Sequence, residues 1–122
     1  MGKKRVLLIA DDDREIHKIF SGYFSRDYDV LHAYDGADTL MLAAEHLPDI
    51  ILLDLRMPIL DGRTVCRKIR DNPRTKDVRI VMITGKGGEY DRLVGLEVGA
   101  DEYVEKPVSL EVLARTLERI LK

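Results

Sequence analysis

Residues 6–13 read Val-Leu-Leu-Ile-Ala-Asp-Asp-Asp, a short and continuously apolar run that ends in three consecutive aspartates. A run of this kind is typical of a strand covered on both faces of a parallel sheet. Three further apolar runs each lead to one polar side chain: 50–53 to Asp54, 80–83 to Thr84, and 103–104 to Lys106. If the runs are parallel strands, these side chains meet at one edge of the sheet, where ligands bind in such folds.

The segments between these runs carry the three- and four-residue periodicity of helices, most clearly at 16–24 and 110–120. A further strand is expected at 28–33. Three more helices are expected: one after Asp35-Gly36 that closes at Pro48, one from Asp61-Gly62 that stops before Asn72-Pro73, and one with Leu93, Val94 and Leu96 that ends near Gly99. Strand and helix alternate five times, which predicts one domain over residues 1–122. Its fold class is α/β, with a doubly wound, five-stranded parallel sheet and five helices.

The composition is that of a soluble globular domain. The 122 residues include 20 basic and 22 acidic side chains, with a net charge of -2, so direct nucleic-acid binding is not expected. No apolar stretch is long enough to cross a membrane and no signal-peptide pattern opens the chain, so we expect a cytoplasmic location. The single cysteine, Cys66, excludes an internal disulfide and is expected to be an inert, buried or half-buried thiol.

The three adjacent aspartates, Asp11, Asp12 and Asp13, open the first predicted helix. Capping of exposed backbone N–H groups accounts for one of them, Asp13 or Asp12. Three neighbouring carboxylates also repel one another, which calls for a compensating cation. Magnesium fits best because it prefers oxygen ligands, and capping and metal binding both stay open at this point.

The other strand-end residues have ordinary readings as well as functional ones. Asp54 is a polar strand terminus or a nucleophile toward phosphorus. Lys106 is a solvated charge or a counterion for the carboxylates and a phosphate, and a cis Lys106-Pro107 bond would fix its direction. Thr84 is a strand residue chosen for its branched side chain, or a hydroxyl at the site. The three histidines, His17, His32 and His46, lie on different elements and are expected to have surface or helix-face roles.

Taken together, these segments resemble the receiver domain of two-component response regulators. The resemblance covers essentially the whole chain, and the motifs that carry it are Asp11-Asp12, residues 52–58 with Asp61-Gly62, Ile83-Thr84-Gly85, and residues 99–107. It implies a flavodoxin-like fold with strand order 2-1-3-4-5. It also implies that Asp54 accepts a phosphoryl group from a phosphohistidine on a sensor histidine kinase or a histidine phosphotransfer protein.

The resemblance further assigns roles within the site. Magnesium would be held directly by Asp12, Asp54 and the backbone carbonyl of Arg56, with Asp11 acting largely through water. Lys106 would contact the phosphoryl oxygens, the Thr84 hydroxyl would move to meet one of them, and the Tyr103 ring would turn inward in response. Arg56 and Lys86 match positions that tune the lifetime of the phosphoryl group, by shielding it from water, or else face solvent.

The implied output surface comprises the fourth helix, the last strand and the last helix. It would control a downstream protein target or an attached output domain, with a phosphorylation-dependent dimer as one form of output. The chain would be a stand-alone receiver or part of a longer regulator or hybrid kinase, and a switch rather than an enzyme, apart from self-phosphorylation and self-dephosphorylation.

Two alternatives accompany this interpretation. A pseudo-receiver would only dock onto a partner, and would need none of the site residues. A phosphohydrolase of the haloacid-dehalogenase type would carry a second aspartate two positions after the nucleophile as its general acid, and this chain has Arg56 there.

Overall fold

The computed structural model describes residues 3–85 and 97–122, and in this part of the chain strands and helices alternate as expected. The elements are β1 (Arg5–Ala10), α1 (Arg14–Phe24), β2 (Tyr28–Ala33), α2 (Gly36–His46), β3 (Ile50–Asp54), α3 (Gly62–Asp71), β4 (Arg79–Thr84), β5 (Glu102–Glu105) and α5 (Leu110–Leu121). The helix predicted around Leu93, Val94 and Leu96 lies outside the described residues, as do Lys86, Gly87 and Gly88. Four of the five predicted helices are therefore described.

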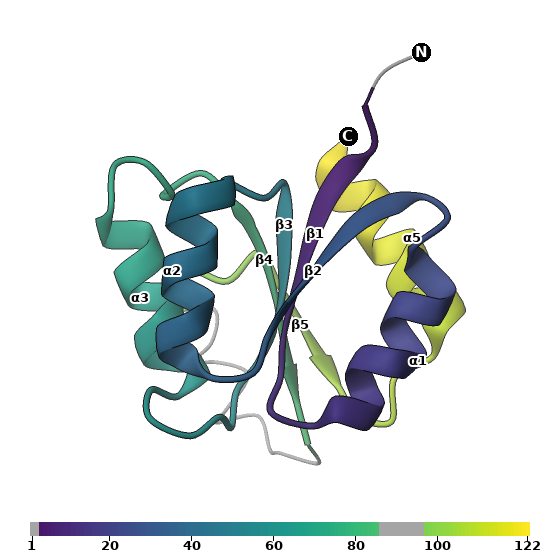
Figure 1. Ribbon diagram of the computed structural model, residues 1–122, viewed down its shortest axis with the longest axis horizontal. Coiled ribbons are helices and arrows are strands. Elements are labelled where there is room, and N and C mark those ends of the chain that lie inside the picture. Colours follow the sequence, from purple (N-terminus) through teal and green to yellow (C-terminus); the bar gives the residue numbers. More distant parts are fainter. Residues whose placement is uncertain (1–2, 86–96) are drawn as a thin grey trace.

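The strands form one parallel sheet in the order β2-β1-β3-β4-β5, which confirms the predicted fold. Helices α1 and α5 cover one face, and α2 and α3 cover the other (Figure 1). The strand order reverses between β1 and β3, whose pairing runs from Leu7–Ile50 to Ala10–Leu53. In doubly wound sheets this reversal opens a crevice at the carboxyl ends of the strands, which is where Asp11 and Asp54 lie.

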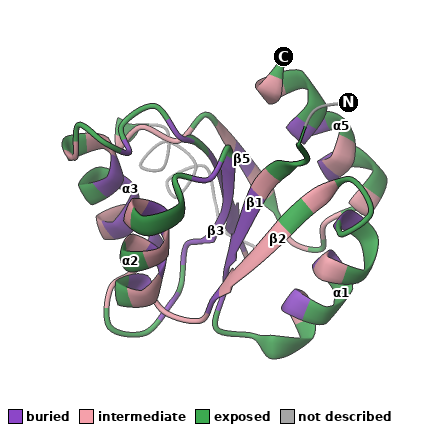
Figure 2. Cartoon of the chain, turned by 45° about the horizontal axis from the view of Figure 1, so that its top comes forward, coloured by how far each residue is buried: buried purple, intermediate pink, exposed green. Residues whose placement is uncertain are grey.

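The core explains why the strand runs are continuously apolar. Every residue of β3 is buried, and Figure 2 shows that burial concentrates in the central strands. Alternate side chains face opposite sides, so Leu8 and Ile51 pack in one core cluster while Leu7 and Ile50 pack in the other. Two covered faces leave no position along these strands for a polar side chain until the strand ends.

Each described helix begins with a side-chain cap that satisfies a free backbone N–H. The capping residues and the amides they accept from are Asp13 with Glu15, Asp35 with Asp38, Asp61 with Thr64, and Ser109 with Val112. Of the two candidates for capping the first helix, Asp13 is therefore the one that caps it. This leaves Asp11 and Asp12 available for another role.

The helices differ from the expected pattern in one respect. In α1, Phe20 and Phe24 are buried, but Ile19 and Tyr23 of the same periodic set are 45% and 41% exposed. The apolar stripe is thus wider than the face that packs on the sheet. Among the described residues, no helix has both the length and the apolar character needed to cross a membrane.

Candidate functional site

Three carboxylates converge at the carboxyl edge of the sheet. One oxygen from each of Asp11, Asp12 and Asp54 lies within 4.8 Å of the others, and no other such group of potential metal ligands occurs in the described parts of the chain. Asp11 and Asp54 are buried, whereas Asp12 is exposed. The pairing of β1 with β3 brings Asp11 and Asp54 together, although about forty residues of sequence separate them. This was expected, because each aspartate follows an apolar run that forms a parallel strand. An all-oxygen set of this kind suits a hard divalent cation such as Mg²⁺.

Lys106 supplies the positive charge of the site. Its Nζ lies 3.5 Å from Asp11 Oδ2 and 3.8 Å from Asp54 Oδ1, and its side chain is 31% exposed. The Lys106 amide donates to the carbonyl of Thr84 over 2.7 Å, which extends the β4–β5 pairing to this residue. The Lys106–Pro107 peptide bond is cis. Among the described residues, one ammonium thus faces three carboxylates, and this cluster keeps an excess of negative charge.

The electrostatics of Asp54 reflect this imbalance. Burial raises the pKa of Asp54 to about 6, and the neighbouring Asp11 carboxylate adds to the increase. The Lys106 ammonium and the backbone N–H of Arg56 act in the opposite direction and lower the pKa. The Arg56 N–H donates to Asp54 Oδ1 over 3.4 Å. A cation bound among the three carboxylates would favour the ionised form of Asp54.

The loop after β3 folds tightly against the acceptor strand. The Leu55 amide donates to the carbonyl of Ile83 over 2.8 Å, and the Gly62 amide donates to the carbonyl of Leu55 over 2.8 Å. A Cβ at position 62 would lie 2.5 Å from the Asp54 carbonyl oxygen, so only glycine permits this approach. The pair Asp61-Gly62 therefore both caps α3 and lets the loop close beside Asp54.

Thr84 and Tyr103 occupy the neighbouring strands. Thr84 ends β4 and is fully buried, and its Oγ1 has no hydrogen-bond partner among the described residues. A buried hydroxyl without a partner is costly, so this group is available for a ligand at the strand edge. Tyr103 pairs with Met82 in the sheet and is 9% exposed, within the core cluster on the α2–α3 side.

The sequence interpretation missed one feature next to the site. His17 was expected on the surface or on a helix face, but it is 3% exposed and contacts His32 and the Asp11 carbonyl. Its spacing of three and seven residues from the buried Phe20 and Phe24 was an available signal. The contact with His32 had no sequence signal, because the two residues lie on separate elements. Cys66, in contrast, is buried as expected, and burial raises the pKa of its thiol to about 11.

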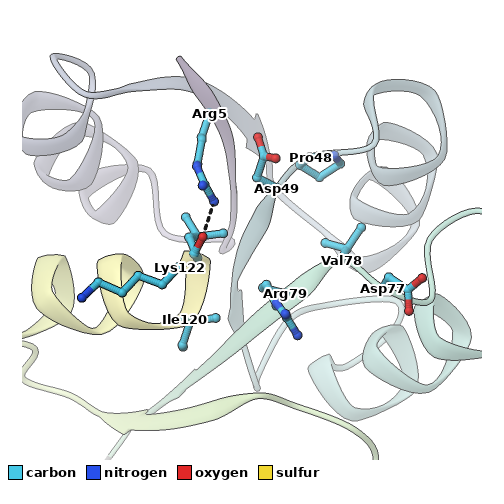
Figure 3. Close-up of a pocket in the computed structure, with 9 residues that line it drawn as sticks. Arg5, Pro48, Asp49, Asp77, Val78, Arg79, Ile120 and Lys122 are labelled. Carbon is cyan, nitrogen blue, oxygen red and sulfur yellow. Dashed lines mark hydrogen bonds between the residues drawn. The ribbon is translucent and has the colours of Figure 1, made fainter. Parts of the chain in front are cut away.

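A pocket of about 290 Å³ lies at the opposite edge of the sheet, where the strands begin (Figure 3). Arg5, Asp49, Arg79 and Lys122 are among the residues that line it, and Arg5 Nη1 donates to the Leu121 carbonyl over 2.7 Å. Its charges are mixed, and they do not form a cluster of potential metal ligands like the one at the carboxyl edge. The site chemistry therefore belongs to the other end of the strands.

This fold and this acidic edge are those expected of a receiver-type signalling domain, and the comparisons with known proteins agree. Residues 7–118 match the response regulator receiver domain family, and the chain belongs to that family. Receiver domains of this family are signalling modules of two-component systems that bind Mg²⁺ at an acidic site and pair with histidine kinases and output domains.

Individual relatives support the assignment. Response regulator PleD from Caulobacter vibrioides is 42% identical over 104 residues, which are 85% of this chain and 23% of PleD. The chain thus spans about a quarter of the length of that relative. A response regulator structure from Chloroflexus aurantiacus J-10-fl has a TM-score of 0.92 and 32% identity, and covers 98% of both chains. The receiver domain of sensor histidine kinase PA1611 from Pseudomonas aeruginosa PAO1 has a TM-score of 0.89, 28% identity and 98% coverage of both chains, and was solved with magnesium in its active site cleft.

Proposed function

We propose that the chain is a phosphorylation-operated switch in which Asp54 accepts a phosphoryl group from a phosphohistidine. The observation that carries the proposal is the convergence of Asp54 with two further carboxylates and the Lys106 ammonium at one strand edge. The negative phosphoryl oxygens repel an attacking carboxylate, so the transfer needs positive charge beside those oxygens. The site offers one fixed ammonium and an acidic set that recruits a second cation.

The transfer exchanges one bond to phosphorus for another. A carboxylate oxygen of Asp54 forms a bond to phosphorus while the phosphorus–nitrogen bond of the donor breaks. The electron pair of that bond stays on the imidazole nitrogen, which takes up a proton. The product is an acyl phosphate on Asp54, so the reaction is a covalent group transfer without redox change.

Magnesium would be held by Asp12, Asp54 and the Arg56 carbonyl, with Asp11 contributing largely through water. Bound there, the ion neutralises charge that develops on the phosphoryl oxygens. The donor set supports this assignment, because the cluster is all oxygen and partly exposed through Asp12. In the same site Lys106 would pair with a phosphoryl oxygen as a point charge, and Pro107 would help to fix the direction of the Lys106 backbone.

Thr84 and Tyr103 would connect phosphorylation to output. The buried Thr84 hydroxyl, which has no partner among the described residues, would donate to a phosphoryl oxygen. Thr84 would move to make this contact. The ring of Tyr103, two strand positions before Glu105, would turn inward in response and alter the surface that includes β5 and α5. The partners would be a sensor histidine kinase or histidine phosphotransfer protein on the input side and a protein target or attached output domain on the other, in the cytoplasm.

The test is labelling by a small phosphodonor. With acetyl phosphate and magnesium, intact mass spectrometry should show one added phosphoryl group, and chelation of magnesium should suppress it. Asp54→Asn should abolish the label, whereas Asp13→Asn, which alters only the helix cap, should retain it. Equal labelling of the Asp54→Asn variant and the starting chain would overturn the assignment of Asp54. Absence of labelling in the starting chain would favour a docking module instead.

A further inference from the structure

A pair of hydrogen-bonded histidines contacts the acidic turn. His17 Nδ1 lies 2.7 Å from His32 Nδ1, and His17 Nε2 lies 2.7 Å from the carbonyl oxygen of Asp11. His17 is in α1 and is 3% exposed, while His32 is in β2 and half-buried. The pair therefore links β2 to the residue that directly follows β1, through a side chain of the helix that covers both strands (Figure 1).

The hydrogen bonds assign the protons of the neutral pair. A carbonyl oxygen only accepts, so the proton between His17 and Asp11 must be on His17 Nε2. A neutral His17 then has a lone pair on Nδ1, which accepts from the Nδ1–H of His32. Burial, and then the neighbouring His17, lower the pKa of His32. The arrangement is thus a directed chain of donors that runs from His32 through His17 to Asp11.

Aromatic contacts hold both rings in place. The Tyr34 ring centroid lies 4.3 Å from that of His17, and it stacks on His32 at 6.4 Å with an interplanar angle of 14°. The Arg14 guanidinium carbon lies 4.5 Å from the Tyr34 ring centroid. Rings packed in this way have little freedom to rotate, so the donor direction toward Asp11 is fixed before any ligand binds.

The contact completes the set of bonds that orient Asp11. Asp11 Oδ1 accepts from the backbone N–H of Asp13 over 2.8 Å, and Oδ2 lies 3.5 Å from Lys106 Nζ. His17 Nε2 donates to the carbonyl oxygen of Asp11. That carbonyl belongs to the peptide unit between Asp11 and Asp12, so its direction also constrains Asp12. Loss of the His17 donor would free this peptide unit to turn.

We infer that His17 and His32 are positioning residues that hold the Asp11–Asp12 peptide in the orientation needed to bind a divalent cation. The inference rests on the proposed function, since it assigns the pair to the same acidic site. Groups that orient metal ligands commonly change metal affinity by about 10- to 100-fold when they are removed. His17 acts on the backbone between two ligands, so we expect an effect near the lower of these values.

Calorimetric titration with magnesium alone tests the role, using His17→Leu, which replaces the imidazole with an apolar side chain of similar volume and so removes the donor. We expect about tenfold weaker magnesium binding than in the starting chain. His17→Gln, whose side-chain amide can donate to the same carbonyl, should recover most of the affinity. Phe24→Leu is the matched control, because Phe24 is buried in the same helix at the end away from the site. It should lower stability without changing the magnesium affinity.

A magnesium-free measurement tests the proton arrangement directly. Long-range proton–nitrogen spectra at pH 8 should show His17 protonated on Nε2 and His32 protonated on Nδ1. Free neutral histidine prefers the Nε2–H form, so the Nδ1–H form of His32 is a distinctive signature. In His17→Leu, His32 should revert to the Nε2–H form.

The outcomes separate this inference from the proposed function. If the starting chain binds no magnesium, the proposed metal site fails. If the starting chain binds magnesium but His17→Leu binds it within twofold as well, only the positioning role is overturned. Equal weakening of magnesium binding in His17→Leu and Phe24→Leu would show that the effect of His17 comes from a general loss of stability. It would also overturn the positioning role. An Nε2–H form of His32 in the starting chain would exclude the donor chain.

Discussion

The Lys106 ammonium lies 3.8 Å from an Asp54 oxygen and is the only positive side chain with an ion pair to that carboxylate in the described part of the chain. Asp54 ends β3 and Lys106 directly follows β5, with β4 between the two strands. At this distance the ammonium favours the ionised form of Asp54, against the opposing effects of burial and Asp11. Substitution of Lys106 therefore removes the positive side chain that lowers the pKa of Asp54.

Removal of that contact should raise the pKa of Asp54. In Lys106→Met, which keeps the apolar stem, we expect the pKa to rise above the value of about 6 in the starting chain. Carbon-detected titration of the Asp54 carboxyl by NMR measures it directly. Lys122→Met, at the opposite edge of the sheet, is the control and should leave the value unchanged (Figure 3). An unchanged pKa in Lys106→Met would contradict the geometry.

Neutralising Asp54 should stabilise the metal-free chain at high pH. The pKa of Asp54 is raised from 3.8 to about 6, so the folded state holds this proton more tightly than the unfolded state. Stability from this source is present below pH 3.8 and is lost as pH rises through about 6. At roughly 1.4 kcal/mol per pH unit, the loss is about 3 kcal/mol.

In urea unfolding with a chelator present, Asp54→Asn should therefore have a higher free energy of unfolding than the starting chain at pH 8. This difference should disappear toward pH 4. Asp29→Asn, an exposed carboxylate in β2, serves as the control and should change stability by less than about 0.5 kcal/mol. A gain that is independent of pH would show that burial of the charge is not its source.

The Thr84 hydroxyl should cost stability and be required for the response to a phosphoryl mimic. Thr84→Val has nearly the same shape and removes a buried Oγ1 that has no partner among the described residues, so the metal-free chain should gain about 1 kcal/mol. Beryllofluoride with magnesium should raise the melting temperature of the starting chain, because a ligand that binds the folded state stabilises it. The increase should be clearly smaller in Thr84→Val. An equal increase in both proteins would exclude a contact between this hydroxyl and the phosphoryl group.

The end of α2 offers a stabilising substitution that is independent of the site. Leu47 has φ of 47° and ψ of 61°, a left-handed conformation that costs a residue with a Cβ about 1 kcal/mol. Its side chain is 47% exposed, so little packing is lost on removal. Leu47→Gly should raise the free energy of unfolding by about this amount in urea. Leu47→Ala keeps the Cβ and should not, and a similar gain in both would assign the effect to the lost side chain.

Much of the fold was predictable from the chain because its signals are local. The helix Gly62–Asp71 begins and ends where Asp61-Gly62 and Asn72-Pro73 predict, since capping and the restriction before proline act over a few residues. The apolar run before Asp54 identifies a buried strand, because only a strand covered on both faces lacks polar alternation. Parallel strands then bring Asp11 and Asp54 to one edge by topology alone.

The order of the described elements, the parallel sheet and the acidic edge were predictable from the chain alone. The inward turn of His17 toward His32, in contrast, was decided by packing in three dimensions. The physical reason is the range of the interactions. Periodicity and caps depend on neighbours along the chain, whereas a contact between His17 in α1 and His32 in β2 depends on how the helix settles on the sheet, and that is fixed by packing over the whole core.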